Sequence, residues 1–174
     1  MQLIKQTALS LLFFAFILSF SSCEKDSEKD KVTLFTKNGV VMSGAQETPP
    51  NPSAALGSLD ISYSKGSKTL VYKFTWTGLA DTITGIHIHG LAPEGYGQIA
   101  GAPSNIVQGI LNGKNETLFP FRGGSYSGTL LVDGVKVKEE NLLNGLYYLN
   151  IHTKGINPNG GTYAGGEIRA QIKF

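Results

Sequence analysis

Apolar and polar side chains alternate over residues 69–77 of the chain. Four apolar side chains share one face of this segment: Leu70, Tyr72, Phe74 and Trp76. A period of two is typical of a β-strand with one buried face, and the same pattern recurs at residues 58–63. The intervening residues 64–68, Ser-Lys-Gly-Ser-Lys, have the composition of a turn. The two segments are therefore predicted to form an antiparallel hairpin.

The same criterion predicts six more strands, at residues 34–42, 83–89, 105–110, 126–132, 146–153 and 166–174. Residues 138–144 interrupt the pattern, because acidic residues come early and Gly145 follows, which predicts about two turns of helix. The chain has 174 residues, of which 22 are glycine, and this suits one loop-rich domain. We therefore expect an all-β sandwich or Greek-key barrel of about eight strands, with one short helix and long loops at residues 90–104 and 154–165.

The N-terminus is typical of an export signal. Lys5 precedes an apolar run at residues 8–20, which is too short to cross a hydrocarbon core of about 30 Å but fits the centre of a signal peptide. The run ends in Phe20-Ser21-Ser22-Cys23, which resembles the lipobox of bacterial lipoproteins, where the cysteine receives lipid. A plain secretory signal with an incidental cysteine is the alternative.

These features divide the chain into a signal peptide (1–22), the lipidated Cys23 with a charged tether (23–31), and a β domain (32–174). We expect an exported protein of the cell envelope, anchored to the outer membrane by its N-terminal lipid, on the periplasmic side or at the cell surface. Cys23 is the only cysteine, so no intrachain disulfide can form. The net charge of +2 gives no basic field for nucleic acid, which we do not expect as a partner.

All three histidines of the chain, His87, His89 and His152, lie in predicted strands. Side chains two residues apart on a strand share a face, so His87 and His89 project together, opposite apolar neighbours. The same alternation applies to the strands that contain His152 and Glu167. If the three strands lie in one sheet with their apolar faces inward, one outer face carries all the polar side chains: His87, His89, Asn150, His152, Glu167, Arg169 and Gln171.

This face has the ligand types of a metal site. Two imidazoles at positions i and i+2 can converge on one ion, and a third imidazole with a carboxylate completes a four-ligand set suited to zinc, copper or iron. One hypothesis is therefore a single zinc or copper ion held by the three histidines, with Glu167 as the fourth ligand. Asn150, Arg169 and Gln171 would then support the ligands from behind.

A purely structural interpretation remains open. Imidazoles on a sheet face can hydrogen-bond to Asn150, Glu167 or loop carbonyls and so hold the long loops down. Glu167 and Arg169 can likewise form a surface ion pair worth at most about 1 kcal/mol. The register between the strands decides which interpretation applies.

Four motifs follow one another along the predicted β domain: Ser43-Gly44-Ala45-Gln46-Glu47-Thr48-Pro49-Pro50, Thr84-Gly85-Ile86-His87-Ile88-His89-Gly90, Tyr148-Leu149-Asn150-Ile151-His152-Thr153 and Gly165-Gly166-Glu167-Ile168-Arg169-Ala170-Gln171-Ile172. Together they resemble the CHRD family, whose domain is named after chordin, over about residues 33–174. The resemblance implies an immunoglobulin-like β-barrel distantly similar to copper–zinc superoxide dismutase. It also implies a secreted or lipid-anchored protein, as many bacterial members are.

The resemblance indicates the fold, and no clear biochemical function follows from it. Three histidines and one cysteine are too few for a two-metal dismutase site, and no nucleophile motif is recognisable. The favoured hypothesis is a non-catalytic binding or structural module of the cell envelope, whose loops contact a protein or glycan through Tyr96 and Tyr163. The alternative is a mononuclear zinc or copper protein with a metal-handling or redox role.

Overall fold

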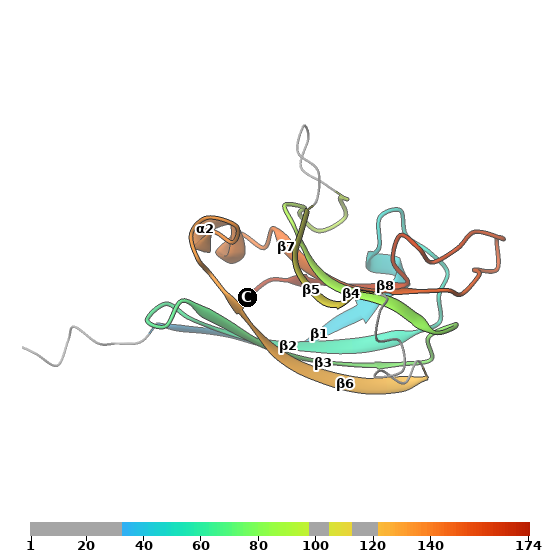
Figure 1. Cartoon of the computed structure of the whole chain (residues 1–174), viewed down its shortest axis with the longest axis horizontal. Helices are drawn as coiled ribbons and strands as arrows, with labels where there is room; N and C mark the ends of the chain where they lie inside the picture. The colour runs from blue at the N-terminus through green and yellow to red at the C-terminus, as the bar shows by residue number, and fades with distance from the viewer. Residues whose placement is uncertain (1–32, 98–104, 113–121) are drawn as a thin grey trace, which may run out of the picture. The chain divides into compact units, whose positions relative to one another are not determined.

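The computed structural model describes residues 33–97, 105–112 and 122–174 (Figure 1). The predicted signal peptide, Cys23 and the tether lie outside these residues. The described part contains eight strands: β1 (Leu34–Ser43), β2 (Leu56–Ser64), β3 (Thr69–Thr77), β4 (Ile83–Gly90), β5 (Asn105–Asn112), β6 (Gly123–Leu131), β7 (Tyr147–Thr153) and β8 (Ile168–Ile172). It also contains one α-helix, α2 (Glu139–Leu143), and one 3-10 turn, η2 (Gly44–Gln46).

All eight strands belong to one antiparallel sheet, in the order β5-β4-β7-β8-β1-β2-β3-β6. Figure 1 shows the sheet folding back on itself, so that β4, β5, β7 and β8 face β1, β2, β3 and β6. The two edge strands, β5 and β6, lie close to each other. Gln108 of β5 donates from Nε2 to the carbonyl oxygen of Thr129 on β6, at 3.0 Å. The sheet is therefore a nearly closed barrel, and the predicted all-β architecture is confirmed.

The apolar face of each alternating segment fills the barrel. The predicted hairpin is confirmed, since β2 and β3 pair along their length with Ile61 opposite Tyr72. Removing each such side chain from water stabilises the fold by about 1.5–3 kcal/mol. The core contains buried residues of both layers, among them Leu59, Ile61, Leu70, Tyr72, Phe74, Ile86, Ile88, Leu149, Ile151, Ile168 and Ile172.

The predicted helix is confirmed as α2, one residue shorter at each end than residues 138–144. Gly145 follows it with a φ of 67°, the left-handed conformation that glycine adopts at little cost. The helix is tied to the barrel by Tyr63, whose hydroxyl donates to Oε2 of Glu139 at 2.6 Å.

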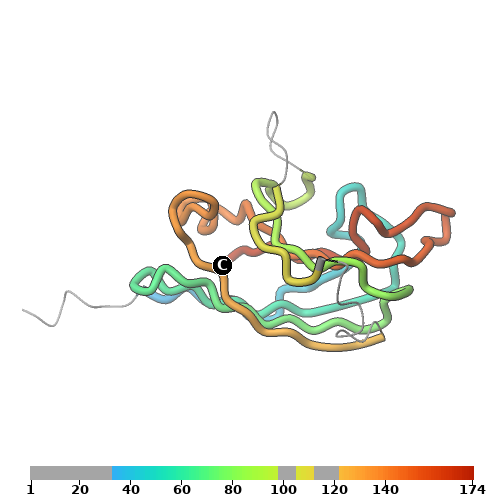
Figure 2. Tube along the Cα trace, viewed as in Figure 1, coloured from blue at the N-terminus to red at the C-terminus, as the bar shows by residue number. Residues whose placement is uncertain are grey.

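The structure corrects one prediction about burial. All five residues of β8 are buried, including the polar Arg169 and Gln171. Three segments cover the polar face of β4, β7 and β8, at residues 44–55, 91–97 and 154–166. The first and third of these lie side by side (Figure 2), and Nδ2 of Asn51 donates to the carbonyl oxygens of Gly166 and Glu167, at 3.1 Å each. The polar face that we expected at the surface is thus largely buried under loops.

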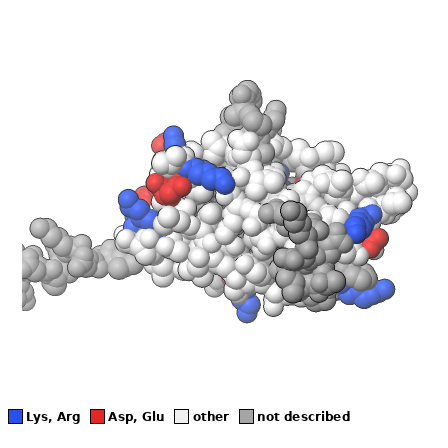
Figure 3. Space-filling model, viewed as in Figure 1, with Lys and Arg blue, Asp and Glu red and all other residues white. Residues whose placement is uncertain are grey.

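The helices and the surface charge bear on whether the domain could contact a membrane or a charged partner. Among the described residues, no helix has the length and apolar character needed to cross a bilayer. On the face drawn in Figure 3, lysine, arginine and acidic side chains form small groups, and the surface between them is uncharged. The described residues of this face therefore present no continuous field of one sign.

Candidate metal centre

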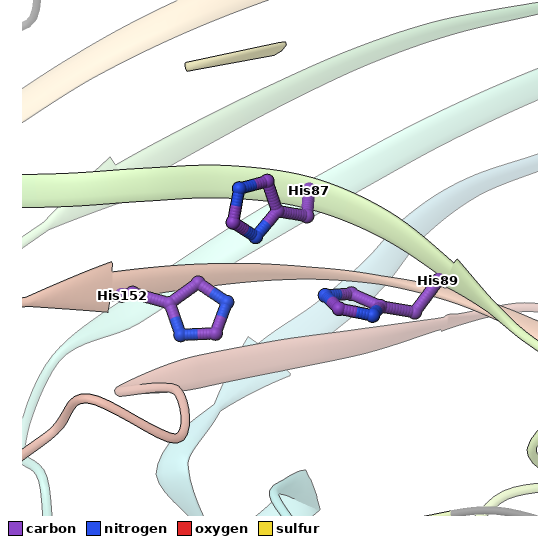
Figure 4. Close-up of side chains that lie close together, drawn as sticks. All are labelled: His87, His89 and His152. Atoms are coloured by element: carbon purple, nitrogen blue, oxygen red, sulfur yellow. The ribbon is translucent and has the colours of Figure 1, made fainter. Parts of the chain in front are cut away.

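The three histidines come together on the covered face. His87 and His89 extend from β4 and His152 from the adjacent β7, and their rings turn toward a common point (Figure 4). One nitrogen from each ring lies within 4.8 Å of the corresponding nitrogens of the other two rings. The ring centroids of His87 and His152 are 4.9 Å apart, and those of His87 and His89 are 5.4 Å apart. Three nitrogens so placed can reach one ion at the 2.0–2.1 Å typical of zinc–imidazole bonds after small side-chain adjustments.

The ring of His152 is held in one tautomer. Its Nδ1 lies 2.8 Å from the carbonyl oxygen of Ala164, and a carbonyl only accepts, so Nδ1 carries the hydrogen. In the neutral ring Nε2 then has a lone pair, and this buried atom has no hydrogen-bond partner among the described residues. The pKa of His152 is lowered, and burial of the ring is the largest cause. The charge of His87 lowers the pKa further, whereas the hydrogen bond to Ala164 raises it. A neutral ring with a fixed, available lone pair is what a metal ligand requires.

Glycine at position 85 gives the rings their room. Gly85 lies opposite His152 in the pairing of β4 with β7. A Cβ added at this position would lie 2.8 Å from Cε1 of His87 and 3.5 Å from Cδ2 of His152. The His87 ring therefore lies over a position that only glycine leaves open.

A stack of three side chains supports His89. Its ring is nearly parallel to that of Tyr148, with centroids 5.1 Å apart and an interplanar angle of 8°. On Tyr148 lies the guanidinium of Arg169, with Cζ 3.6 Å from the ring centroid. Cation–π and aromatic stacking contacts of this kind each contribute about 0.5–2 kcal/mol when buried. The stack fixes the plane of the His89 ring.

The structure does not bring Glu167 to the three histidines. Its side chain is fully buried, and its carboxylate accepts hydrogen bonds from Ser53 Oγ, the Ala80 backbone N–H and Thr153 Oγ1. These donors tie the covering segment, the β3–β4 connection and β7 to the start of β8. Among the described residues, the group of metal-binding side chains contains the three histidines and no carboxylate. The expectation that Glu167 is the fourth ligand is therefore corrected.

Arg169 and Gln171 clamp the segment after β4. Arg169 donates to the carbonyl oxygens of Tyr96 and Pro93, at 3.0 and 3.2 Å, and to Oε1 of Gln171, at 2.7 Å. Gln171 in turn donates to the carbonyl oxygen of Ala92 at 2.8 Å. The surface ion pair that we considered between Glu167 and Arg169 is replaced by these buried contacts. Arg169 also lies over the ring of Tyr148, which stacks on His89, and its role as a supporting residue of a metal site stays a prediction.

Glu47 is a buried acid that we did not predict as a site residue. It is 5 % exposed, and burial raises its pKa to about 7, against the charge of Arg169 and a hydrogen bond from Asn150. A Cβ at Gly166 would lie 2.2 Å from its Oε1, so glycine there allows the carboxyl group to pack against the backbone. Glu47 lies outside the strands, where no alternation indicates the direction of a side chain.

The two tyrosines proposed as partner contacts differ in exposure. Tyr96 is 63 % exposed on the clamped segment 91–97, so its ring is accessible. Tyr163 is 3 % exposed and packs near Gly155, where an added Cβ would lie 3.1 Å from its ring. The structure therefore corrects the expectation for Tyr163, because a buried ring cannot contact a partner.

The family model of the CHRD domain matches residues 39–172. The chain belongs to the CHRD domain family. No curated protein and no solved structure compared with the chain matches it. The resemblance of the four motifs is thus confirmed, while the distant similarity to superoxide dismutase stays a prediction. The matched range includes Glu47, the three histidines and Arg169, so the candidate metal centre belongs entirely to the CHRD domain, a fold that fits an extracellular binding module.

Proposed function

We propose that this CHRD domain is an extracytoplasmic binding module that binds one transition-metal ion through His87, His89 and His152. The observation that carries the proposal is the convergence of three ring nitrogens within 4.8 Å of one another. The hydrogen bond from His152 to Ala164 supports it, because it presents the Nε2 lone pair to the same point.

The donor set favours zinc or copper. Imidazole is a ligand of intermediate softness that suits zinc, copper, iron and nickel, whereas magnesium and calcium prefer oxygen. Three neutral imidazoles leave one position of a tetrahedral ion for a further ligand. A site with an open position fits metal handling or redox chemistry better than a closed structural site does.

The test of metal binding is calorimetric titration of the full chain, purified in detergent and stripped with a chelator, with Zn²⁺ and with Cu²⁺. We expect one ion per chain, and a loss of affinity of at least about 100-fold in His89→Ala. Tyr96→Ala, which leaves the histidines in place, is the matched control and should bind like the wild type. A stoichiometry near zero, or equal affinity in His89→Ala, would refute the proposal.

We further propose that lipid on Cys23 anchors the domain to the outer membrane, on the periplasmic side or at the cell surface. The apolar segment 8–20, followed by Ser21-Ser22-Cys23, supports this proposal. Cells grown with a labelled fatty acid should incorporate the label into the wild type and not into Cys23→Ser. Label in Cys23→Ser, or none in the wild type, would contradict it.

Tyr96 supports a second candidate function, non-catalytic binding of an envelope protein or glycan. Its exposed ring lies on a segment that Arg169 and Gln171 hold by buried hydrogen bonds. A rigid aromatic side chain gives a large contact area at low entropic cost. Partner capture from cell-envelope extracts should fall in Tyr96→Ala and persist in His89→Ala, and the reverse result would assign the capture to the metal centre.

A further inference from the structure

The amide oxygen of Asn150 is an unsatisfied acceptor beside the three histidines. Asn150 lies on β7 between Tyr148 and His152, and it pairs with His87 on β4 and with Arg169 on β8. Asn150 is 2 % exposed, and its Oδ1 has no hydrogen-bond partner among the described residues. Leaving such a buried acceptor unpaired costs about 1–3 kcal/mol, so buried acceptors in folded proteins nearly always have a partner.

The other end of the amide has its partner. The side chain of Asn150 hydrogen-bonds to Glu47, and a Cβ at Gly166 would lie 2.8 Å from Asn150 Nδ2. Gly166 precedes β8, so the nitrogen arm of the planar amide points to the β8 side of β7. The two arms of a planar amide diverge, and the strand on the other side of β7 is β4, where His87 lies opposite Asn150.

We infer that Asn150 Oδ1 accepts a hydrogen bond from a water molecule that fills the fourth position of the metal ion. This inference rests on the proposed function and identifies what completes the site in place of Glu167. Three imidazoles and a water molecule form a tetrahedral site with one exchangeable ligand. A water molecule bound to a cation is a strong donor, and the neutral amide oxygen is an acceptor with no other partner.

Glu47 has a positioning role in this arrangement. By accepting from Asn150 Nδ2, its carboxyl group decides which arm of the amide faces the metal. A pocket between the covering segments is lined by Glu47 and Gly166, the two residues adjacent to Asn150 Nδ2. Solvent space thus extends to the residues that surround the amide.

The arrangement selects the class of exogenous ligand. A ligand that carries both a lone pair and a hydrogen, such as water, satisfies the metal and Asn150 together. A small anion without a hydrogen, such as azide, satisfies the metal alone and leaves Oδ1 unpaired. Asn150 therefore disfavours azide relative to water.

The experiment uses the full chain in detergent loaded with Co²⁺, whose visible spectrum reports its ligands, and titrates it with azide. In Asn150→Leu we expect azide to bind about tenfold more tightly than in the wild type, because water loses its acceptor. Asn150→Asp keeps an acceptor and adds negative charge, so it should bind azide more weakly and Co²⁺ more tightly. Asn38→Leu, the same substitution at an exposed position of β1 outside the site, is the matched control and should bind Co²⁺ and azide like the wild type.

The outcomes separate the two proposals. If the wild type binds one Co²⁺ and both Asn150 variants match it in azide affinity, the role of Asn150 is refuted and the proposed function stands. If the wild type binds no Co²⁺ while circular dichroism shows it folded, the proposed function is refuted, and this inference with it. Should Asn150→Leu fail to fold, Asn150→Asp decides alone: unchanged azide and Co²⁺ affinities overturn the inference.

Discussion

The ring of Tyr148 lies almost parallel to the imidazole of His89, at 5.1 Å between centroids, and this contact joins the candidate metal centre to the clamped segment 91–97. Behind Tyr148, Arg169 reaches the carbonyl oxygens of that segment. A tilt of the tyrosine ring would therefore change both the plane of His89 and the packing of Arg169. The first prediction follows from this stack.

We expect Tyr148→Leu to weaken metal binding about three- to tenfold, because His89 loses the ring that fixes its plane. Tyr148→Phe keeps that ring and should retain wild-type affinity. Zn²⁺ titration of both variants, with urea unfolding to correct for any loss of stability, is the measurement. Equal affinities in the leucine and phenylalanine variants would show that the stack does not position His89.

Gly85→Ala should displace the His87 ring. The added Cβ would lie 2.8 Å from Cε1 of His87, which is closer than real Cβ contacts, so the imidazole must rotate away. Because a misplaced ligand costs affinity, we expect metal binding to fall at least about tenfold.

The control for this variant is Gly165→Ala, where an added Cβ would meet nothing within 4 Å. It should leave the affinity for Zn²⁺ unchanged, as measured by the same titration. If Gly85→Ala binds as tightly as Gly165→Ala, the His87 ring does not contribute to the site.

The Glu167→Gln variant tests whether the carboxylate of Glu167 stabilises the fold or binds the metal ion. The substitution replaces one acceptor oxygen with a donor amide, in a carboxylate that accepts from Ser53, Ala80 and Thr153. We expect the free energy of unfolding to fall by about 1–3 kcal/mol, while the folded protein keeps its affinity for Zn²⁺. A large loss of affinity without a loss of stability would restore Glu167 as a ligand.

Glu47 should make the metal-free domain less stable as the pH rises. Its pKa is raised from 4.5 to about 7, mainly by burial, so between these values the folded chain binds more protons than the unfolded chain. Stability then falls with rising pH, by up to about 3 kcal/mol in total, and levels off above pH 7.

The measurement compares urea unfolding of the wild type and of Glu47→Gln, in a chelating buffer, from pH 4.5 to pH 8. The variant should gain stability relative to the wild type over this range, because glutamine has no charge to bury. His152, whose lowered pKa acts in the opposite direction, is present in both proteins and cancels in the difference. A difference that does not change with pH would contradict the prediction.

Alternation along the strands was sufficient to predict the fold and the side to which each histidine points. The strand predicted at residues 69–77 is β3 without change, and His87 and His89 share a face as expected. The pairing of His87 with Asn150 then places His152 on the diagonal, near enough for the rings to meet. Strand pairing depends on contacts between distant segments, so no local pattern contains it.

Burial and the acidic residues of the site could not be predicted in this way. The alternation of apolar and polar residues predicts the face of β8 from which the Arg169 side chain projects. It does not predict that loops from distant parts of the sequence cover that face. Glu167 precedes the first residue of β8, so the alternation along that strand does not determine where its side chain lies. Its carboxylate accepts hydrogen bonds from neighbouring segments. Glu47 lies in an irregular segment, and the only sequence signal for it was its place in a family motif.

The candidate metal centre is assembled from strands and covering loops that are far apart in the chain. We propose that this chain is exported, and a polypeptide that crosses a membrane unfolded carries no assembled site during its passage. The site forms only when β4, β7 and the loop that contains Ala164 have met on the far side. The ions available in the compartment where the chain folds, and not those of the compartment where it is synthesised, therefore determine which metal the site can acquire.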